Sequence, residues 1–147
     1  MKVKDVMTKH VAVLPPHAPI SEIARLMRDE DVGSIPITWD DRLIGMVTDR
    51  DIVLRALADH PDPRALVARD VMSSKVFYCT EDQTMDEVLE QMGGEQIRRL
   101  PVLDSHHRLS GVVSLGDASQ AVSKKAGGAL KEISHPTAEP VAPPVAH

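Results

Sequence analysis

Aromatic residues are nearly absent from this chain, which has one Trp, one Tyr and one Phe among its 147 residues. A stacking platform for single-stranded nucleic acid depends on aromatic side chains, so this class of site is excluded. The formal net charge of −5 also argues against a nucleic-acid partner, because a phosphate backbone needs a basic face. The core must be built from Val, Ile, Leu, Met and Ala.

Cysteine is almost missing as well. The single Cys79 excludes an intramolecular disulfide, which suits a reducing cytoplasm, and we interpret it as a buried structural thiol. The first residues lack the apolar run of a signal peptide, and no window approaches the roughly 18 apolar residues of a membrane span. We therefore expect a cytoplasmic protein that has no membrane partner.

Catalytic and metal-binding motifs are also lacking. There is no Gly-rich phosphate loop of either common type, and no nucleophile, base and oxyanion donor converge in the sequence. None of the seven histidines forms a pair at helical metal-ligand spacing, and His106-His107 fits a solvated turn. We expect no enzyme, no catalytic cofactor and no metal site; a zinc site assembled from distant histidines is unsupported.

What the chain does contain is an internal repeat. Asp5-Val6-Met7 recurs as Asp70-Val71-Met72, at an offset of 65 residues. The later segment Arg42-Leu43-Ile44-Gly45 matches Arg108-Leu109-Ser110-Gly111 at an offset of 66, since one residue is inserted in the preceding turn. Such a colinear series over roughly 55 residues indicates two copies of one unit.

Each copy is predicted to have the order β-α-β-β-α. In the first copy, a strand at 11–14 precedes a helix whose buried face carries Ile20, Ile23, Ala24 and Met27. Strands at 35–38 and 43–47 then flank a polar turn, and a second helix from about Asp51 carries Ile52, Leu54, Arg55 and Leu57. The second copy begins with a strand at 76–79, and Thr84 with Glu87 forms a capping-box pattern. We predict an α/β (α+β) fold of two repeats related by a pseudo-twofold axis.

The predicted boundaries are a first repeat at 1–58, a linker at 59–69 and a second repeat at 70–123. Two prolines, Pro61 and Pro63, stop a helix in the linker. The stretch 124–147 is rich in Pro and Ala, and we expect it to be disordered. It is either a dispensable tail or a peptide that binds a partner.

One repeated element, Gly-x-Val-[Thr/Ser]-x-x-Asp, places a hydroxyl and a carboxylate at the start of the last helix of each copy. Thr48 with Asp51, and Ser114 with Asp117, fit helix caps. The same groups suit a nucleoside phosphate, since free N–H groups at a helix start bind phosphate and a carboxylate accepts ribose hydroxyls. Both interpretations stay open, and they are compatible.

The residues before each hairpin differ between the copies. The first has Gly33-Ser34, which allows close backbone approach, and the second has Arg98-Arg99, whose forked donors suit phosphates. A solvated pair balanced by nearby glutamates is the alternative for the arginines. The asymmetry suggests two unequal sites.

These repeated segments together make the sequence resemble tandem CBS domains, the Bateman module, over residues 2–122. The resemblance is carried by residues 5–8, 35–37, 45–51, 98–102 and 111–117, whose order and duplication are specific. It implies a CBS pair, homodimers that form a flat disc, and clefts between the copies for AMP, ADP, ATP, NAD or S-adenosylmethionine.

The resemblance also implies roles for particular residues. Asp51 and Asp117 would hold ribose hydroxyls, with Thr48 and Ser114 near phosphate. The base and phosphate region would be lined by Gly33, Ser34, Arg98 and Arg99, and the adenine would be flanked by Val11, Ala12, Val76 and Phe77. Arg50 would add a phosphate contact that the second copy, with Gly116, lacks.

The leading functional hypothesis is a non-enzymatic sensor for signal transduction that binds an adenosyl nucleotide. The alternative is a protein-interaction module with vestigial clefts that acts on a partner protein. A metal- or redox-responsive protein using His106, His107 or Cys79 is a further option.

Overall fold

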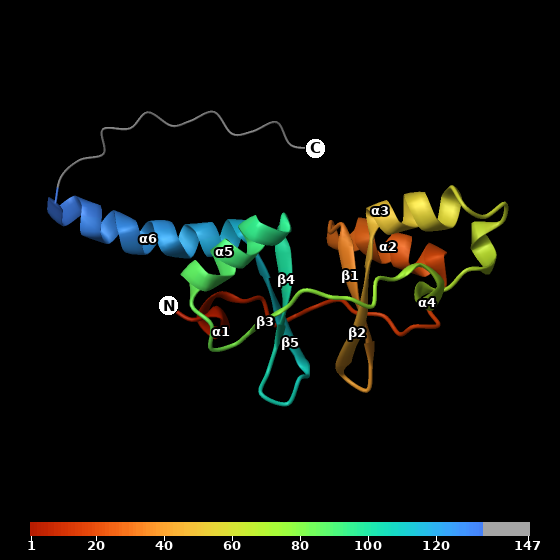
Figure 1. The fold of residues 1–147 in the computed structure, drawn as a ribbon, viewed down its shortest axis with the longest axis horizontal. Helices are drawn as coiled ribbons and strands as arrows, with labels where there is room; N and C mark the ends of the chain where they lie inside the picture. Colours follow the sequence, from red (N-terminus) through yellow and green to blue (C-terminus); the bar gives the residue numbers. More distant parts are fainter. Residues whose placement is uncertain (134–147) are drawn as a thin grey trace.

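Two halves of similar build lie side by side in the molecule (Figure 1). The structure is a computed structural model that describes residues 1–133. The first half holds helix α2 (Ile20–Glu30), strands β1 (Ser34–Trp39) and β2 (Arg42–Thr48), helix α3 (Asp49–Asp51) and π-helix η1 (Ile52–Leu57). The second holds β3 (Cys79–Thr80), α5 (Met85–Glu95), β4 (Arg99–Leu103), β5 (Leu109–Ser114) and α6 (Leu115–Ile133). This mixture of helix and strand confirms the predicted α+β class.

Each half is organised around an antiparallel hairpin. In the first, β1 pairs with β2 around Asp40 and Asp41, whose φ angles of 53° and 62° give the left-handed turn that matches strand twist. In the second, β4 pairs with β5, and the short β3 adds to β4 in parallel. The predicted hairpins are therefore present in both copies.

A short helix precedes each copy and packs into the opposite half. Helix α1 (Val3–Val6) places Val3 in the core of the second half, and α4 (Ala68–Val71) places Val71 in the core of the first. Figure 1 shows α1 beside α5 and α6, and α4 beside the first hairpin. The repeated Asp5 and Asp70 cap these helices, since each carboxylate accepts the backbone N–H three residues earlier, at 3.1 and 2.9 Å.

Backbone pairing follows the same crossing. Thr8 exchanges two hydrogen bonds with Val112 of β5, at 2.8 and 2.9 Å, and Ser73 does the same with Met46 of β2, at 2.9 and 3.0 Å. The segment that leads into each copy is thereby fixed to the hairpin of the other. The two halves are joined through backbone as well as through side chains.

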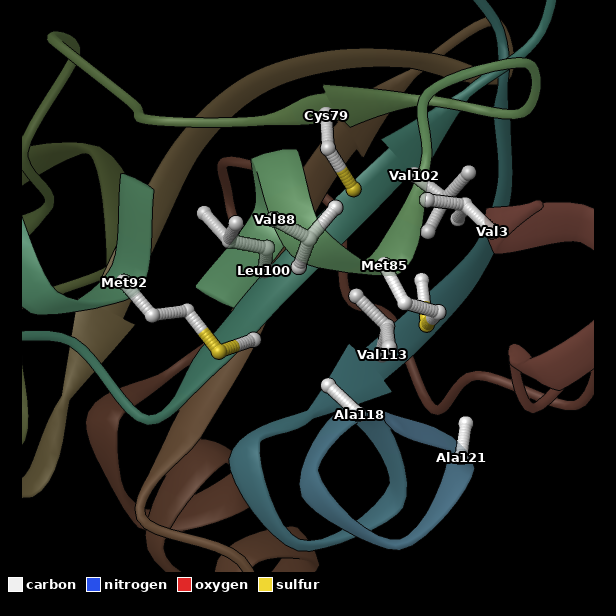
Figure 2. Packing of buried hydrophobic residues seen from close by; sticks show 10 residues of the cluster. All are labelled: Val3, Cys79, Met85, Val88, Met92, Leu100, Val102, Val113, Ala118 and Ala121. Carbon is white, nitrogen blue, oxygen red and sulfur yellow. The ribbon is translucent and has the colours of Figure 1, made fainter. Parts of the chain in front are cut away.

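The cores are aliphatic, as the composition requires. In the second half the sheet and two helices enclose Val88, Leu100, Val113 and Ala118, with Cys79 among them (Figure 2). In the first half Ile20, Ile23 and Met27 of α2 are buried as predicted, but Ala24 is exposed and Leu26 packs against the core instead. The buried face of α2 is thus turned toward Leu26 relative to the face that the sequence pattern suggested.

Three sequence-based boundaries need correction. Of the predicted strand at 11–14, only Leu14 forms a bridge, which pairs it with Ile37. Of the predicted strand at 76–79, only Cys79 lies in β3. In both copies the earlier residues of the predicted strand run between the two halves. The second helix of the first copy begins at Asp49 and becomes a π-helix, which leaves Leu54 and Leu57 exposed and buries Ala56. Helix α6 continues to Ile133, where a loose tail was expected from 124, because Ala, Leu and Lys favour helix. The remaining tail, 134–147, lies outside the described residues.

The predicted linker 59–69 also contains regular structure. A 3₁₀ helix η2 (Pro63–Ala65) begins with Pro63, and the first residues of α4 follow it. A proline suits the first turn of a helix, where its missing N–H has no partner to lose. The same Pro63 that was expected to stop a helix therefore starts one.

Candidate functional site

A cavity of about 280 Å³ lies between the two halves, and we call it site A. Its walls come from residues 8–12, which lead into the first copy and which we call its leading segment, and from the end of α2 and the strands of both hairpins. The leading segment of the second copy is the equivalent stretch, residues 73–77. The lining residues are Thr8, His10, Val11, Ala12, Glu30, Asp31, Val32, Ser34, Pro36, Met46, Arg99, Pro101 and Val112. Four of the predicted site residues, Val11, Ala12, Ser34 and Arg99, therefore line one cavity.

The crossing of the leading segments explains which residues meet at site A. Thr8 pairs with Val112, so residues 8–12 of the first copy run beside β5 of the second. Ser114 lies two residues beyond Val112 on the same strand face and stands in register with Arg99. The Oγ of Ser114 accepts the Asp117 N–H at 3.0 Å. Ser114 and Asp117 are not themselves among the lining residues; they follow shortly after Val112, at the end of a strand that lines the cavity.

The pseudo-twofold relation defines a second position, which we call site B. There the leading segment of the second copy, with Ser73, Val76 and Phe77, runs beside β2, which ends at Thr48. Phe77 stands where site A has Ala12, and its side chain is 39% exposed. The two sites therefore differ in the size of the side chain at this position.

At site B the predicted cap is complete. The Asp51 N–H donates to Thr48 Oγ1 at 3.0 Å, and the Thr48 N–H donates to Asp51 Oδ2 at 2.9 Å. The Asp51 side chain is 14% exposed. The capping interpretation is thus confirmed for Thr48 and Asp51, and in the second copy it is confirmed for the Ser114 hydroxyl.

The residues before the hairpins divide into two roles. The carbonyls of Gly33 and Arg98 accept the N–H of Asp49 and of Leu115, at 2.9 and 2.6 Å, and so hold the start of each following helix. A Cβ on Gly33 would lie 3.1 Å from an Asp49 carboxylate oxygen, so this position has little room for a side chain. Only the next residue of each copy, Ser34 or Arg99, faces site A.

The three candidate phosphate-binding arginines are exposed. Within residues 1–133, as far as side chains are described, Arg50, Arg98 and Arg99 form no salt bridge. The exposure of Arg98 and Arg99 agrees with the alternative of a solvated pair, although neither forms a direct salt bridge with a nearby glutamate among the described side chains. Arg50 and Arg98 do not line the cavity, so Arg99 is the arginine that reaches site A.

Sequence reasoning missed two acidic residues of site A. Glu30 ends α2, and Asp31 caps it in the left-handed conformation, with φ 53°. Both line the same cavity as Arg99 and His10, so two carboxylates share it with one guanidinium and one imidazole. An acidic residue directly after an amphipathic helix was the available signal, because short polar residues tolerate the left-handed cap.

The remaining candidate groups take structural or exposed positions. Cys79 is fully buried, burial raises the pKa of its thiol to about 12, and its Sγ lies 3.7 Å from the Pro101 carbonyl oxygen. It is the buried thiol that was predicted (Figure 2). His106 and His107 are exposed in the β4–β5 turn. Among the side chains that the structure describes, no three His, Cys, Asp or Glu gather as for a metal ion.

None of the helices within residues 1–133 is both long enough and apolar enough to span a bilayer.

Comparison with known proteins gives a consistent result. The family model described as CBS domain matches residues 3–57 and 68–124. The CBS domain-containing protein YhcV of Bacillus subtilis is 41% identical over 135 residues, which are 90% of this chain and 95% of that protein. Hypoxic response protein 1 of Mycobacterium tuberculosis is 36% identical over 124 residues, which are 84% of this chain and 86% of that protein.

Two solved structures have the same fold. The crystal structure of Hypoxic Response Protein I with two coordinated zinc ions has a TM-score of 0.74 and 36% identity, and covers 82% of this chain and 98% of its own. The CBS domain pair of protein MJ0100, in complex with 5′-methylthioadenosine and S-adenosyl-L-methionine, has a TM-score of 0.73 and 27% identity, and covers 85% of this chain and 98% of its own.

Proposed function

Because this chain belongs to the CBS-domain family, as a tandem pair, we propose that it is a non-enzymatic regulatory module that binds an adenosyl ligand at site A. The observation that carries this proposal is the cavity itself, which both copies build. One wall is apolar, with Val11, Ala12 and Pro101, and suits a planar base. The bordering Ser114 and Asp117 suit a sugar.

Each part of the ligand has a proposed partner. Adenine packs between Val11 and Ala12, because the chain has almost no aromatic residues to stack on it. Asp117 accepts hydrogen bonds from two ribose hydroxyls, which are charge-assisted and therefore strong. The 5′ substituent lies toward Ser114 and Arg99. The adenosyl compounds bound by the MJ0100 pair support this class of ligand.

The charge of site A narrows the ligand class further. Glu30 and Asp31 line the cavity together with His10 and with Arg99, which is the one arginine or lysine among the lining residues. Carboxylates repel a polyphosphate chain, whereas they attract a cationic or neutral 5′ group. We therefore propose S-adenosylmethionine or methylthioadenosine as the best ligands, followed by AMP, whose single phosphate can pair with Arg99, and then by ADP, ATP or NAD.

The ligand acts by joining the two copies. Its base contacts the first copy and its sugar the second, so it binds best to one relative placement of the halves. A ligand that favours one placement shifts the population toward it, by as much as its affinity differs between the two. This is the proposed regulatory step.

A specific surface favours protein partners as well. Val53, Leu54 and Leu57 of η1 are 53%, 44% and 56% exposed and form an apolar strip. Exposed apolar patches mark interaction surfaces. We propose that this strip serves a homodimer; a different partner protein, bound without any nucleotide, is the second candidate function.

Calorimetry tests the ligand site. We expect wild type to bind S-adenosylmethionine, methylthioadenosine or AMP, and Asp117→Asn to weaken binding by at least about tenfold, since a charged acceptor of two hydrogen bonds is lost. Asp86→Asn, in the exposed first turn of α5, is the matched control. Unchanged affinity in Asp117→Asn would contradict the residue assignment. Absence of binding to wild type by all these compounds and by ATP and NAD would contradict the function.

A further inference from the structure

Arg55 of η1 joins three groups around site B. Its Nη1 lies 3.8 Å from Asp51 Oδ1, and it donates to the Val71 carbonyl oxygen at 3.1 Å and to Ser73 Oγ at 3.3 Å. The guanidinium therefore links the last helix of the first copy to the leading segment of the second. The ion pair lies within the first copy, whereas both hydrogen bonds reach the start of the second copy.

Two of these groups correspond to ligand positions at site A. Asp51 is the equivalent of Asp117, to which the proposed function gives the ribose hydroxyls. Ser73 is the equivalent of Thr8, which lines the cavity. Arg55 thus stands between the two groups of site B whose equivalents flank a ligand at site A.

The carboxylate of Asp51 is engaged at both oxygens. Oδ2 accepts the Thr48 N–H at 2.9 Å, and Oδ1 faces Arg55. The Asp51 side chain is 14% exposed, whereas Arg55 is 49% exposed and can turn toward solvent. A ribose at site B would compete with Arg55 for the outer oxygen of Asp51.

The second copy lacks this arrangement. The equivalent of Arg55 is Ala121, a buried residue with no polar atom in its side chain. Within the part of the chain that the structure describes, Asp117 forms a hydrogen bond through its backbone N–H, and its carboxylate forms no salt bridge or hydrogen bond. A ligand can therefore bind to the Asp117 carboxylate at site A without first displacing a cation.

We propose that Arg55 is a specificity-determining residue that holds site B closed to the adenosyl ligand, so that site A binds first. This inference rests on the proposed function of site A. Ligand entry at site B must break the contacts of Arg55 with Asp51 and Ser73. An ion pair of this exposure and two hydrogen bonds together weaken the competing ligand by about tenfold.

The inference has a consequence for coupling between the copies. When a ligand displaces Arg55, the bond to the Val71 carbonyl is lost as well, and η1 is released from the leading segment of the second copy. Filling of site B therefore loosens one link between the halves, whereas filling of site A adds one.

Two-site calorimetry on the full chain tests this role, with methylthioadenosine, S-adenosylmethionine and AMP as probes. We expect wild type to bind one molecule tightly and a second at least about tenfold more weakly. Arg55→Ala should strengthen only the weaker site, by about tenfold. Arg55→Gln keeps much of the aliphatic stem and should show the same gain if Arg55→Ala folds poorly. Arg64→Ala, which removes another exposed arginine paired with Asp62, is the matched control.

Combined variants assign the sites. In the Arg55→Ala background, Asp117→Asn should leave one site, and a further Asp51→Asn should remove it. If wild type binds one ligand that depends on Asp117, and Arg55→Ala and Arg55→Gln add nothing, the role of Arg55 is wrong and the proposed function stands. If neither wild type nor the Arg55 variants bind any probe, both are wrong. Two equal sites in wild type would also overturn the role of Arg55.

Discussion

The first copy ends in α3 and the π-helix η1, whereas the second ends in the 19-residue α6. Around the two sites the side chains differ in the same uneven way. Ala12 of one copy corresponds to Phe77 of the other, and Arg55 to Ala121. The first copy provides Ala12 to the lining of site A, and it also carries Arg55, which covers the Asp51 carboxylate at site B.

The copies are alike where their backbones meet. Gly45 of β2 faces Met72 and Ser73, and Gly111 of β5 faces Met7 and Thr8 in the equivalent contact. At both crossings a side chain in place of glycine would collide with the leading segment of the other copy. At the proposed ligand positions the copies share the hydroxyl and the carboxylate, but Ala12 replaces Phe77 and Arg55 replaces Ala121, and so the two sites are unequal.

The largest expected effect concerns this crossing. A Cβ on Gly111 would lie 2.8 Å from the Thr8 carbonyl oxygen, whereas a Cβ on Gly45 would lie 3.2 Å from the Ser73 carbonyl oxygen. Neither glycine has a positive φ, so the cost is one of space. Because backbone cannot move as readily as a side chain, Gly111→Ala should lower the free energy of unfolding by about 2–3 kcal/mol, and Gly45→Ala by about 1 kcal/mol.

Urea denaturation measures both losses. Gly93→Ala, in α5 where a Cβ would meet nothing within 4 Å, is the control that should not destabilise. If Gly45→Ala cost as much as Gly111→Ala, the two crossings would be equally tight in solution, and the difference in distance would carry no energetic meaning.

Much of the frame could be predicted from the sequence. The offset of 65 residues identified the equivalent positions, and Thr84 with Glu87 identified the start of α5. Local hydrogen bonds of this kind depend on residues close in the chain, which a sequence pattern contains.

The partner of each leading segment could not be predicted. The repeat shows that Thr8 and Ser73 are equivalent, but not that each pairs with the hairpin of the other copy. That pairing depends on packing between the halves, and it places the segment that carries Ala12 beside the strand that precedes Asp117. The acidic lining by Glu30 and Asp31 was missed for the same reason, since α2 and the cavity meet only in the folded chain.

The next largest expected effect is a dependence of the unfolding free energy on pH that comes from Cys79. The equivalent residue of the first copy, Leu14, has no group that titrates. Burial raises the pKa of the Cys79 thiol from 9.0 to about 12. The thiol thus stays protonated in the folded chain at a pH where the unfolded chain releases the proton. Its contribution to stability is fully present below pH 9 and is lost as the pH rises toward 12.

Cys79→Ala isolates this contribution. From pH 8 to pH 10, wild type should lose about 1.4 kcal/mol more unfolding free energy than Cys79→Ala, since one pH unit above the unfolded pKa corresponds to that amount. Urea midpoints at the two pH values measure it. Equal losses would show that the thiol ionises in the folded chain and that the second core is open to water near Cys79.

The smallest expected effect on stability concerns the hydroxyl caps of the two last helices, Thr48 and Ser114. Thr48 and Asp51 exchange two hydrogen bonds, at 2.9 and 3.0 Å, whereas Ser114 accepts one from Asp117, at 3.0 Å. Thr48→Ala and Ser114→Ala each remove one hydroxyl acceptor, whereas the bond from the Thr48 backbone N–H to Asp51 survives, so each should cost a similar amount, about 1 kcal/mol of stability. Ligand binding should separate the two variants, with the larger loss in Ser114→Ala, because Ser114 is assigned to site A and Thr48 lies at the site that Arg55 covers. A Thr48→Ala variant that weakened the tight site more than Ser114→Ala would mean that the two sites have been assigned the wrong way round.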